Sequence, residues 1–166
     1  PTINHSMHST TNYNLAPSFP VNGKVFSGWD LIMKELKSRI ENSHHNRYIL
    51  IVECYQGVHP SELRHAFQLL NATTFIESGQ AFYPEEKIRE ITYPDVTDDA
   101  IFGYMTSLTY NDLLDPIKVE QFRAEINKAK GLVVVYGNAA SIIAESYDCL
   151  VYADMARWEI QLRQRK

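Results

Sequence analysis

YILIV at residues 48–52, followed by ECYQGVHPSEL at residues 53–63, is the stretch that decides the fold. The first five residues form a continuous apolar run, which is typical of a strand buried on both faces of a sheet. A short loop with a single glycine follows, and Pro60 favours the first turn of a helix. The stretch therefore predicts a strand, a tight loop and a helix, which is the basic unit of an α/β fold.

The loop in this unit lacks the lysine of a working phosphate loop. In the motif G-x-x-x-x-G-K-[ST], backbone amides cradle the phosphates and the lysine reaches their outer oxygens. Here Gly57 is followed by Val58-His59 near the Gly-Lys position, and Glu62 adds a negative charge. The pattern predicts a degenerate phosphate loop, with Gly57, His59 and Ser61 as candidates for an anion site on backbone amides. A plain strand-to-helix turn explains the same residues.

Strand and helix patterns alternate along the rest of the chain. This alternation predicts a three-layer α/β fold whose mainly parallel sheet has about five strands, with residues 48–52 and 132–136 at its centre. The predicted strands are 48–53, 73–77, 102–108, 132–136 and 150–153. The predicted helices begin near Gly28, Pro60 and Pro84 and then cover 110–114, 116–130, 138–145 and 154–166, with Tyr93-Pro94 ending the third.

The 166 residues are enough for one domain. Residues 1–27 are polar and predict an irregular N-terminal arm, and residues 28–166 predict the P-loop-kinase-like α/β domain. The chain stops on an Arg-rich helix without a C-cap, so we expect it to be truncated from a longer protein. A net charge of −4 gives no reason to expect nucleic acid or a membrane as partner.

The two cysteines bear on the compartment. Cys54 ends one predicted strand and Cys149 begins another, so parallel strands would hold them on the order of 15 Å apart. A disulfide needs Cα atoms within about 7 Å. We therefore expect two free thiols and a cytoplasmic location, and no segment has the order of a signal peptide.

Two polar residues around the last strand are the remaining site candidates. Asp154 follows the strand, where it suits either a cation or substrate hydroxyl in a cleft or the N-cap of the last helix. Arg157 suits either a lid that closes on a phosphate or a solvated face on which Glu159 pairs with Arg163. A further prediction is that Met155 and Trp158 pack against the sheet while Arg157 faces the cleft.

No catalytic or metal-binding motif accompanies these candidates. The six histidines show neither H-E-x-x-H nor a Cys/His pattern with zinc spacing, and G-x-S-x-G is missing. We therefore assign no catalytic residue and no metal ligand from the sequence.

Three blocks of sequence resemble a known family: YQGV at 55–58, YPDVTDDAIFG at 93–103 and LVYADMARWEIQLR at 150–163. Together they look like the amino-terminal region of the long class I mannose-6-phosphate isomerases of gut anaerobic bacteria. That region is itself similar to uridine-kinase-like P-loop proteins. The resemblance covers most of the chain from about Gly28 onward, and it places Gly57 at the loop, Asp154 at the strand end and Arg157 on the lid-like helix.

The resemblance implies a non-catalytic accessory domain. In such isomerases the conversion of mannose 6-phosphate to fructose 6-phosphate is carried by a following zinc-binding cupin barrel, which no stretch of this chain matches. The implied partners are that C-terminal cupin domain and a phosphorylated small molecule, and no cofactor is implied for the chain itself. The alternative is a small-molecule or nucleoside kinase with an atypical loop, in which Arg157 or Lys24 replaces the missing lysine.

Overall fold

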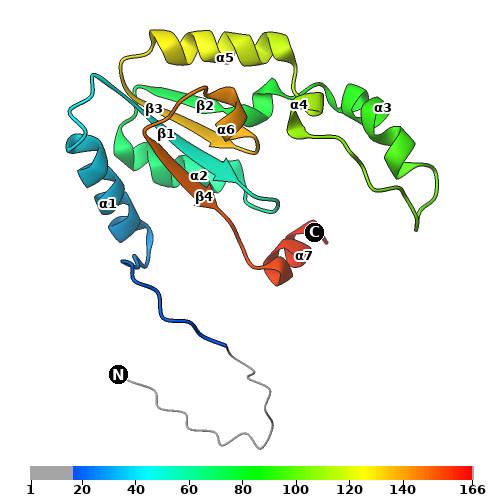
Figure 1. The fold of residues 1–166 in the computed structure, drawn as a ribbon, viewed down its shortest axis with the longest axis horizontal. Helices are drawn as coiled ribbons and strands as arrows, with labels where there is room; N and C mark the ends of the chain where they lie inside the picture. The colour runs from blue at the N-terminus through cyan, green and yellow to red at the C-terminus, as the bar shows by residue number, and fades with distance from the viewer. Residues whose placement is uncertain (1–16, 166) are drawn as a thin grey trace, which may run out of the picture.

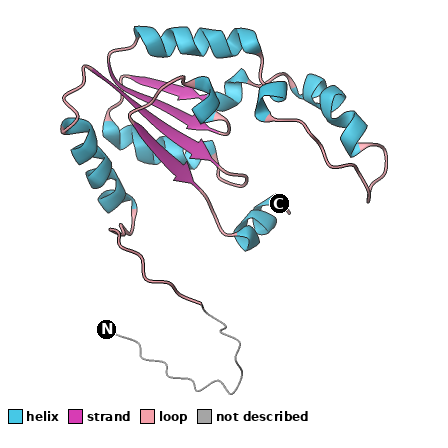
Figure 2. Ribbon diagram, in the orientation of Figure 1, coloured by secondary structure: helices cyan, strands magenta, loops and turns pink. Residues whose placement is uncertain are grey.

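A sheet of four parallel strands forms the centre of the protein in the computed structural model, which describes residues 17–165 (Figures 1 and 2). The strand order is β2-β3-β1-β4, and every neighbouring pair runs parallel. The predicted central position of residues 48–52 and 132–136 is confirmed, because β1 and β3 lie inside the sheet. The strands are β1 (Arg47–Cys54), β2 (Thr74–Glu77), β3 (Gly131–Gly137) and β4 (Cys149–Ala153).

Helices cover both faces of this sheet, which confirms the predicted three-layer α/β fold. One core cluster joins the sheet to α1 and α2, and a second joins the other face to α5 and α6. Alternate residues of β1 serve the two clusters, Leu50 and Val52 in the first and Ile49 and Ile51 in the second. The helices are α1 (Trp29–Glu41), α2 (Pro60–Phe67), α3 (Glu85–Val96), α4 (Tyr110–Leu113), α5 (Pro116–Lys128), α6 (Ala140–Ile143) and α7 (Arg157–Gln164).

Three predictions of secondary structure were wrong. Residues 102–108 form no strand and stay exposed except for the partly buried Leu108, so the sheet has four strands rather than five. Helix α3 continues through Pro94 to Val96, because a proline near the end of an exposed helix frees a carbonyl that water can solvate. The last helix begins at Arg157 rather than Asp154, since β4 is followed by three residues outside any helix.

Within the predicted N-terminal arm, residues 17–27 have no regular secondary structure and are exposed except for Phe26. The rest of that predicted arm, residues 1–16, lies outside the described residues.

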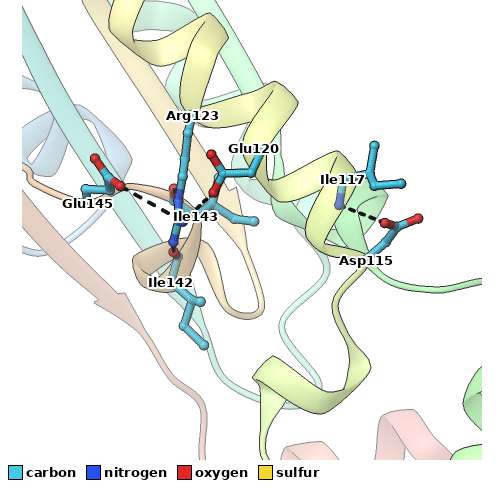
Figure 3. A network of polar contacts seen from close by, with 7 residues as sticks. All are labelled: Asp115, Ile117, Glu120, Arg123, Ile142, Ile143 and Glu145. Carbon is cyan, nitrogen blue, oxygen red and sulfur yellow. Dashed lines mark hydrogen bonds and ion pairs between the residues drawn. The ribbon is translucent and has the colours of Figure 1, made fainter.

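Arg123 on α5 fixes the position of the short helix α6 (Figure 3). Its guanidinium donates hydrogen bonds to the carbonyl oxygens of Ile142 at 3.1 Å and Ile143 at 3.3 Å. Glu120 accepts from the same group at 2.7 Å, and Glu145 lies 4.0 Å away. These bonds satisfy carbonyls at the end of α6. They thereby tie α6, which follows the carboxyl end of β3, to α5.

Candidate functional site

A cleft of about 610 Å³ opens beside the carboxyl ends of β1 and β4. Ligands of open parallel α/β sheets bind on this side of the strands. The cleft brings the two predicted candidates Asp154 and Arg157 together. Its lining consists of Tyr55, Gln56, Tyr152, Asp154, Met155, Arg157, Ile160, Gln161 and Gln164.

Two tyrosines form the strand side of this cleft. The rings of Tyr55 and Tyr152 lie with their centroids 6.5 Å apart and their planes at 51°. Desolvation and the nearby charge of Asp154 raise the pKa of Tyr152, so its phenol stays protonated and can donate a hydrogen bond at neutral pH. Both rings remain about half exposed, which leaves aromatic surface for a ligand to cover.

The two charged residues of the cleft are not neutralised by each other. Asp154 accepts a hydrogen bond from the backbone amide of Met155 at 2.7 Å, and Arg157 is exposed at the start of α7. Within residues 17–165 neither side chain takes part in an ion pair. The alternative role of Asp154 as a helix N-cap was wrong, because Ala156 holds that position.

The loop between β1 and α2 is covered by α7. Gly57 has a φ of 86°, and a Cβ built there would lie 3.1 Å from the sulfur of Met155 and 3.2 Å from Cγ1 of Ile160. Arg163 donates a hydrogen bond to the Gly57 carbonyl at 3.0 Å and lies 3.4 Å from Glu62. The glycine is thus explained by the close approach of α7, and the negative charge of Glu62 is met by an arginine of the same chain.

The other two residues of the predicted anion site lie apart from the cleft. His59 is the exposed N-cap of α2, and Ser61 is exposed one residue after Pro60. In the part of the chain that the structure describes, neither side chain makes a hydrogen bond or ion pair, and neither lines the cleft. The start of α2 at Pro60 agrees with the plain strand-to-helix turn.

Glu53, near the end of β1, is a polar residue that sequence reasoning missed, and it lies outside the lining of the cleft. Its carboxylate accepts hydrogen bonds from the backbone amides of Ala139 and Ser141, both at 2.7 Å. The loop after β3 therefore forms a small anion cradle, and the carboxylate of β1 fills it. The sequence did offer a signal, because Glu53 is an acidic residue at the end of an otherwise apolar strand. A buried carboxylate is stable only when hydrogen bonds or an ion pair compensate its charge.

Two neighbours of Glu53 are packed tightly. Gly137 has a φ of 118°, and the hydroxyl of the fully buried Ser78 lies 2.5 Å from the position that its Cβ would take. Burial raises the pKa of the Cys54 thiol to about 11, so it stays protonated and is not a nucleophile. As predicted, Cys54 and Cys149 are both free, since Cys149 lies beside Leu50 rather than beside Cys54.

The predicted packing of the last helix was partly wrong. Trp158 is 66% exposed, and Ile160 is the buried residue of α7. Because the helix begins later than predicted, its inward face is set by Ile160 and Arg163. Met155 precedes the helix and contacts Gly57 while it lines the cleft with Arg157.

Replacing Arg163 tests whether α7 is held on the loop. We expect Arg163→Ala to lower the free energy of unfolding by about 1–2 kcal/mol, because a carbonyl loses a charged donor. Amides 57–63 should exchange hydrogen faster at the same time. The matched control is Glu159→Gln, which touches only an exposed pair with Arg163 and should cost less than about 0.5 kcal/mol. Urea titration and hydrogen exchange measure both, and unchanged exchange in Arg163→Ala would contradict the assignment.

Residues 17–165 contain neither a membrane-spanning helix nor a cluster of metal-binding side chains. No helix there is long and apolar enough to cross a membrane. No three side chains of His, Cys, Asp or Glu lie close enough in that range to hold a metal ion.

Comparisons with known proteins give one finding. No curated protein matches the chain, and neither does any solved structure. A family model, DUF8485, described as a domain of unknown function, matches residues 28–166 and so covers the sheet, the cleft and every helix found within residues 17–165. The chain therefore belongs to the DUF8485 family.

Proposed function

We propose that this chain is a non-catalytic accessory domain of a mannose-6-phosphate isomerase-type protein, and that it binds a phosphorylated small molecule in the cleft beside α7. The link to the isomerases rests on the sequence resemblance. The domain would work next to the C-terminal cupin barrel, in the cytoplasm. No side chains within residues 17–165 are grouped as zinc ligands, so we assign the zinc chemistry of the isomerase to the cupin barrel and not to these residues.

One observation carries the proposal: α7 covers the loop between β1 and α2, whereas the cleft beside α7 is open. The loop between β1 and α2 is occupied by α7, whose Arg163 bonds Gly57. The phosphates of a nucleotide bound at this loop would have to displace α7, and the negative charge of Glu62 would repel them. The neighbouring cleft offers the guanidinium of Arg157, which has no ion-pair partner within residues 17–165 and is the group best suited to a phosphate.

The rest of the cleft suits the sugar end of a sugar phosphate. Tyrosine rings such as Tyr55 and Tyr152 pack against the apolar face of a hydroxylated ring. The Asp154 carboxylate accepts hydrogen bonds from hydroxyl groups, and the amides of Gln161 and Gln164 both donate and accept. In this arrangement the phosphate binds the positive charge of Arg157 and the sugar hydroxyls donate to the negative charge of Asp154. Each charged side chain of the cleft then has a complementary ligand group.

Calorimetric titration with mannose 6-phosphate tests the proposal. We expect binding by the wild-type chain, and Arg157→Gln should weaken it about tenfold or more, since one charged hydrogen-bonded contact to phosphate is lost. Arg39→Gln on α1 is the matched control, because this exposed arginine lies outside the cleft and pairs with Glu35. Unphosphorylated mannose should bind more weakly than mannose 6-phosphate. Equal binding by the two sugars would count against the role of Arg157.

The same calorimetric titration, with MgATP as the ligand, tests the kinase alternative. We expect no micromolar affinity for MgATP and no conversion of mannose 6-phosphate to fructose 6-phosphate by the zinc-supplemented chain. Micromolar MgATP binding that Arg163→Ala strengthens would restore the kinase, because it would locate nucleotide at the loop under α7. Turnover of the sugar phosphate would contradict a non-catalytic domain.

A further inference from the structure

The segment from Glu85 to Leu108, here called the projection, extends away from the sheet (Figure 1). Helix α3 forms its first half, and none of the helix's residues is buried. The second half returns toward α4 and exposes large apolar side chains. These are Ile101 at 81%, Phe102 at 73%, Tyr104 at 76% and Met105 at 100% exposure. Clustered apolar side chains of this kind mark an interaction surface.

The return half of the projection is held in a defined shape. Asp99 accepts hydrogen bonds from the amides of Ile101 at 2.8 Å and Phe102 at 3.0 Å, and the Tyr104 amide donates to the Asp95 carbonyl at 2.8 Å. Gly103 is required there, since a Cβ would lie 2.6 Å from the Asp95 oxygen. The apolar side chains are thus presented by a structured turn, so less conformational entropy is lost when a partner covers them.

The charge of the projection limits the kind of partner. Residues 85–108 hold six carboxylates and two basic side chains, a net charge of −4, which equals the net charge of the whole chain. The remaining residues are therefore neutral in sum. A surface that receives the projection should be apolar with a basic component.

The exposed face of α7 has that composition. Trp158, Leu162 and Arg165 lie at i, i+4 and i+7, so they share one side of the helix. Trp158 is 66% exposed and Leu162 is 38% exposed. Arg165 is the basic residue of this face and complements the acidic projection, whereas Arg163 is turned inward to Gly57 and Glu62.

We propose that two copies of this chain form a symmetric dimer in which the projection of each protomer docks on the exposed α7 face of its partner. The projection leads on from the outer strand β2, and α7 leads on from the opposite outer strand β4. Both lie beyond the carboxyl end of the parallel sheet (Figure 1). Two molecules that face each other across this end can therefore exchange both contacts at once, as a two-fold axis requires.

Sedimentation velocity over a range of micromolar concentrations tests the dimer. The wild-type chain should shift from monomer to dimer as concentration rises, and it should do so less at high salt because the complementary charges are screened. Met105→Asp and Trp158→Asp should each raise the dissociation constant about tenfold or more, since both residues anchor the contact. Ile117→Asp is the matched control. It replaces an apolar residue on α5 that is 69% exposed, and it should leave the dimer intact.

Mixing the two variants separates reciprocal docking from other modes of association. A mixed dimer of Met105→Asp and Trp158→Asp contains one wild-type contact, whereas either variant alone contains none. The mixture should therefore dimerise more strongly than each variant by itself. At a concentration where all three chains are monomeric, circular dichroism should show the same melting for both variants and the wild type, because the replaced side chains are exposed.

Two results would overturn the proposal. One is a wild-type chain that stays monomeric at high micromolar concentration, including the case in which the projection closes on α7 of its own chain. The other is a dimer that both variants leave unchanged. Neither result bears on the cleft of Arg157, which is tested by ligand titration.

Discussion

Glu53→Ala is expected to lower the free energy of unfolding by about 3 kcal/mol. The carboxylate accepts two short hydrogen bonds, from the amides of Ala139 and Ser141, and each such bond to a charged group contributes about 1.5–3 kcal/mol. Alanine leaves both amides without an acceptor in a partly buried place. The loss should therefore exceed that of an ordinary surface substitution several-fold.

Urea unfolding followed by circular dichroism measures this loss. Glu53→Gln should fall in between, at about 1–2 kcal/mol, because its amide keeps one acceptor oxygen and turns a donor toward the second backbone amide. Glu145→Ala is the control, since this exposed carboxylate lies 4.0 Å from Arg123 and should contribute less than about 0.5 kcal/mol. Equal stability of Glu53→Ala and Glu145→Ala would show that the cradle after β3 does not depend on β1.

Gly137→Ala is expected to cost about 3 kcal/mol as well. Its φ of 118° is a backbone conformation that side chains other than glycine rarely adopt. The added Cβ would also lie 2.5 Å from the Ser78 hydroxyl, which is fully buried and bonded to the carbonyls of Tyr136 and Asn138. Strain and overpacking of this kind cost about 1–3 kcal/mol each.

A double-mutant cycle separates the two causes. Ser78→Ala with Gly137→Ala should recover part of the loss, because the hydroxyl that meets the new Cβ is gone while the backbone strain stays. Gly23→Ala is the control, since nothing lies within 4 Å of a Cβ there. A Gly137→Ala variant as stable as Gly23→Ala would contradict the tight contact between η2 (Ser78–Ala81) and the end of β3.

The strands of this fold were easier to predict than its helix ends. The continuous apolar runs at 48–52 and 132–136 must be buried on both faces, and strands at the centre of a sheet are buried in this way. Pro94 and Asp154 were misread because local preferences set a helix end only when packing does not override them. Residues 102–108 look apolar enough for a strand, yet their turn is closed by Asp95 and Asp99 instead of a sheet neighbour.

Some residues of the candidate site could be predicted from the sequence and others could not. Asp154 and Arg157 were found because they follow a strand whose carboxyl end meets the ligand side of the sheet. The Arg163 contact with Gly57 and the Glu53 contact with Ser141 join segments far apart in sequence, and no spacing rule reaches that far. The two tyrosines of the cleft lie one on each of two neighbouring elements, so only the parallel pairing of β1 with β4 brings them together.

The strand order also fixes when the protein can fold during synthesis. Strand β1 leaves the ribosome before both of its neighbours, β3 and β4, which come only after residues 55–130. Until Gly131–Gly137 has emerged, the apolar residues of β1 have no strand to pair with, and non-local pairing of this kind is slow. The apolar residues of β1 are therefore expected to stay unpaired while residues 55–130 are synthesised, which makes this stretch a substrate for chaperones that bind apolar segments.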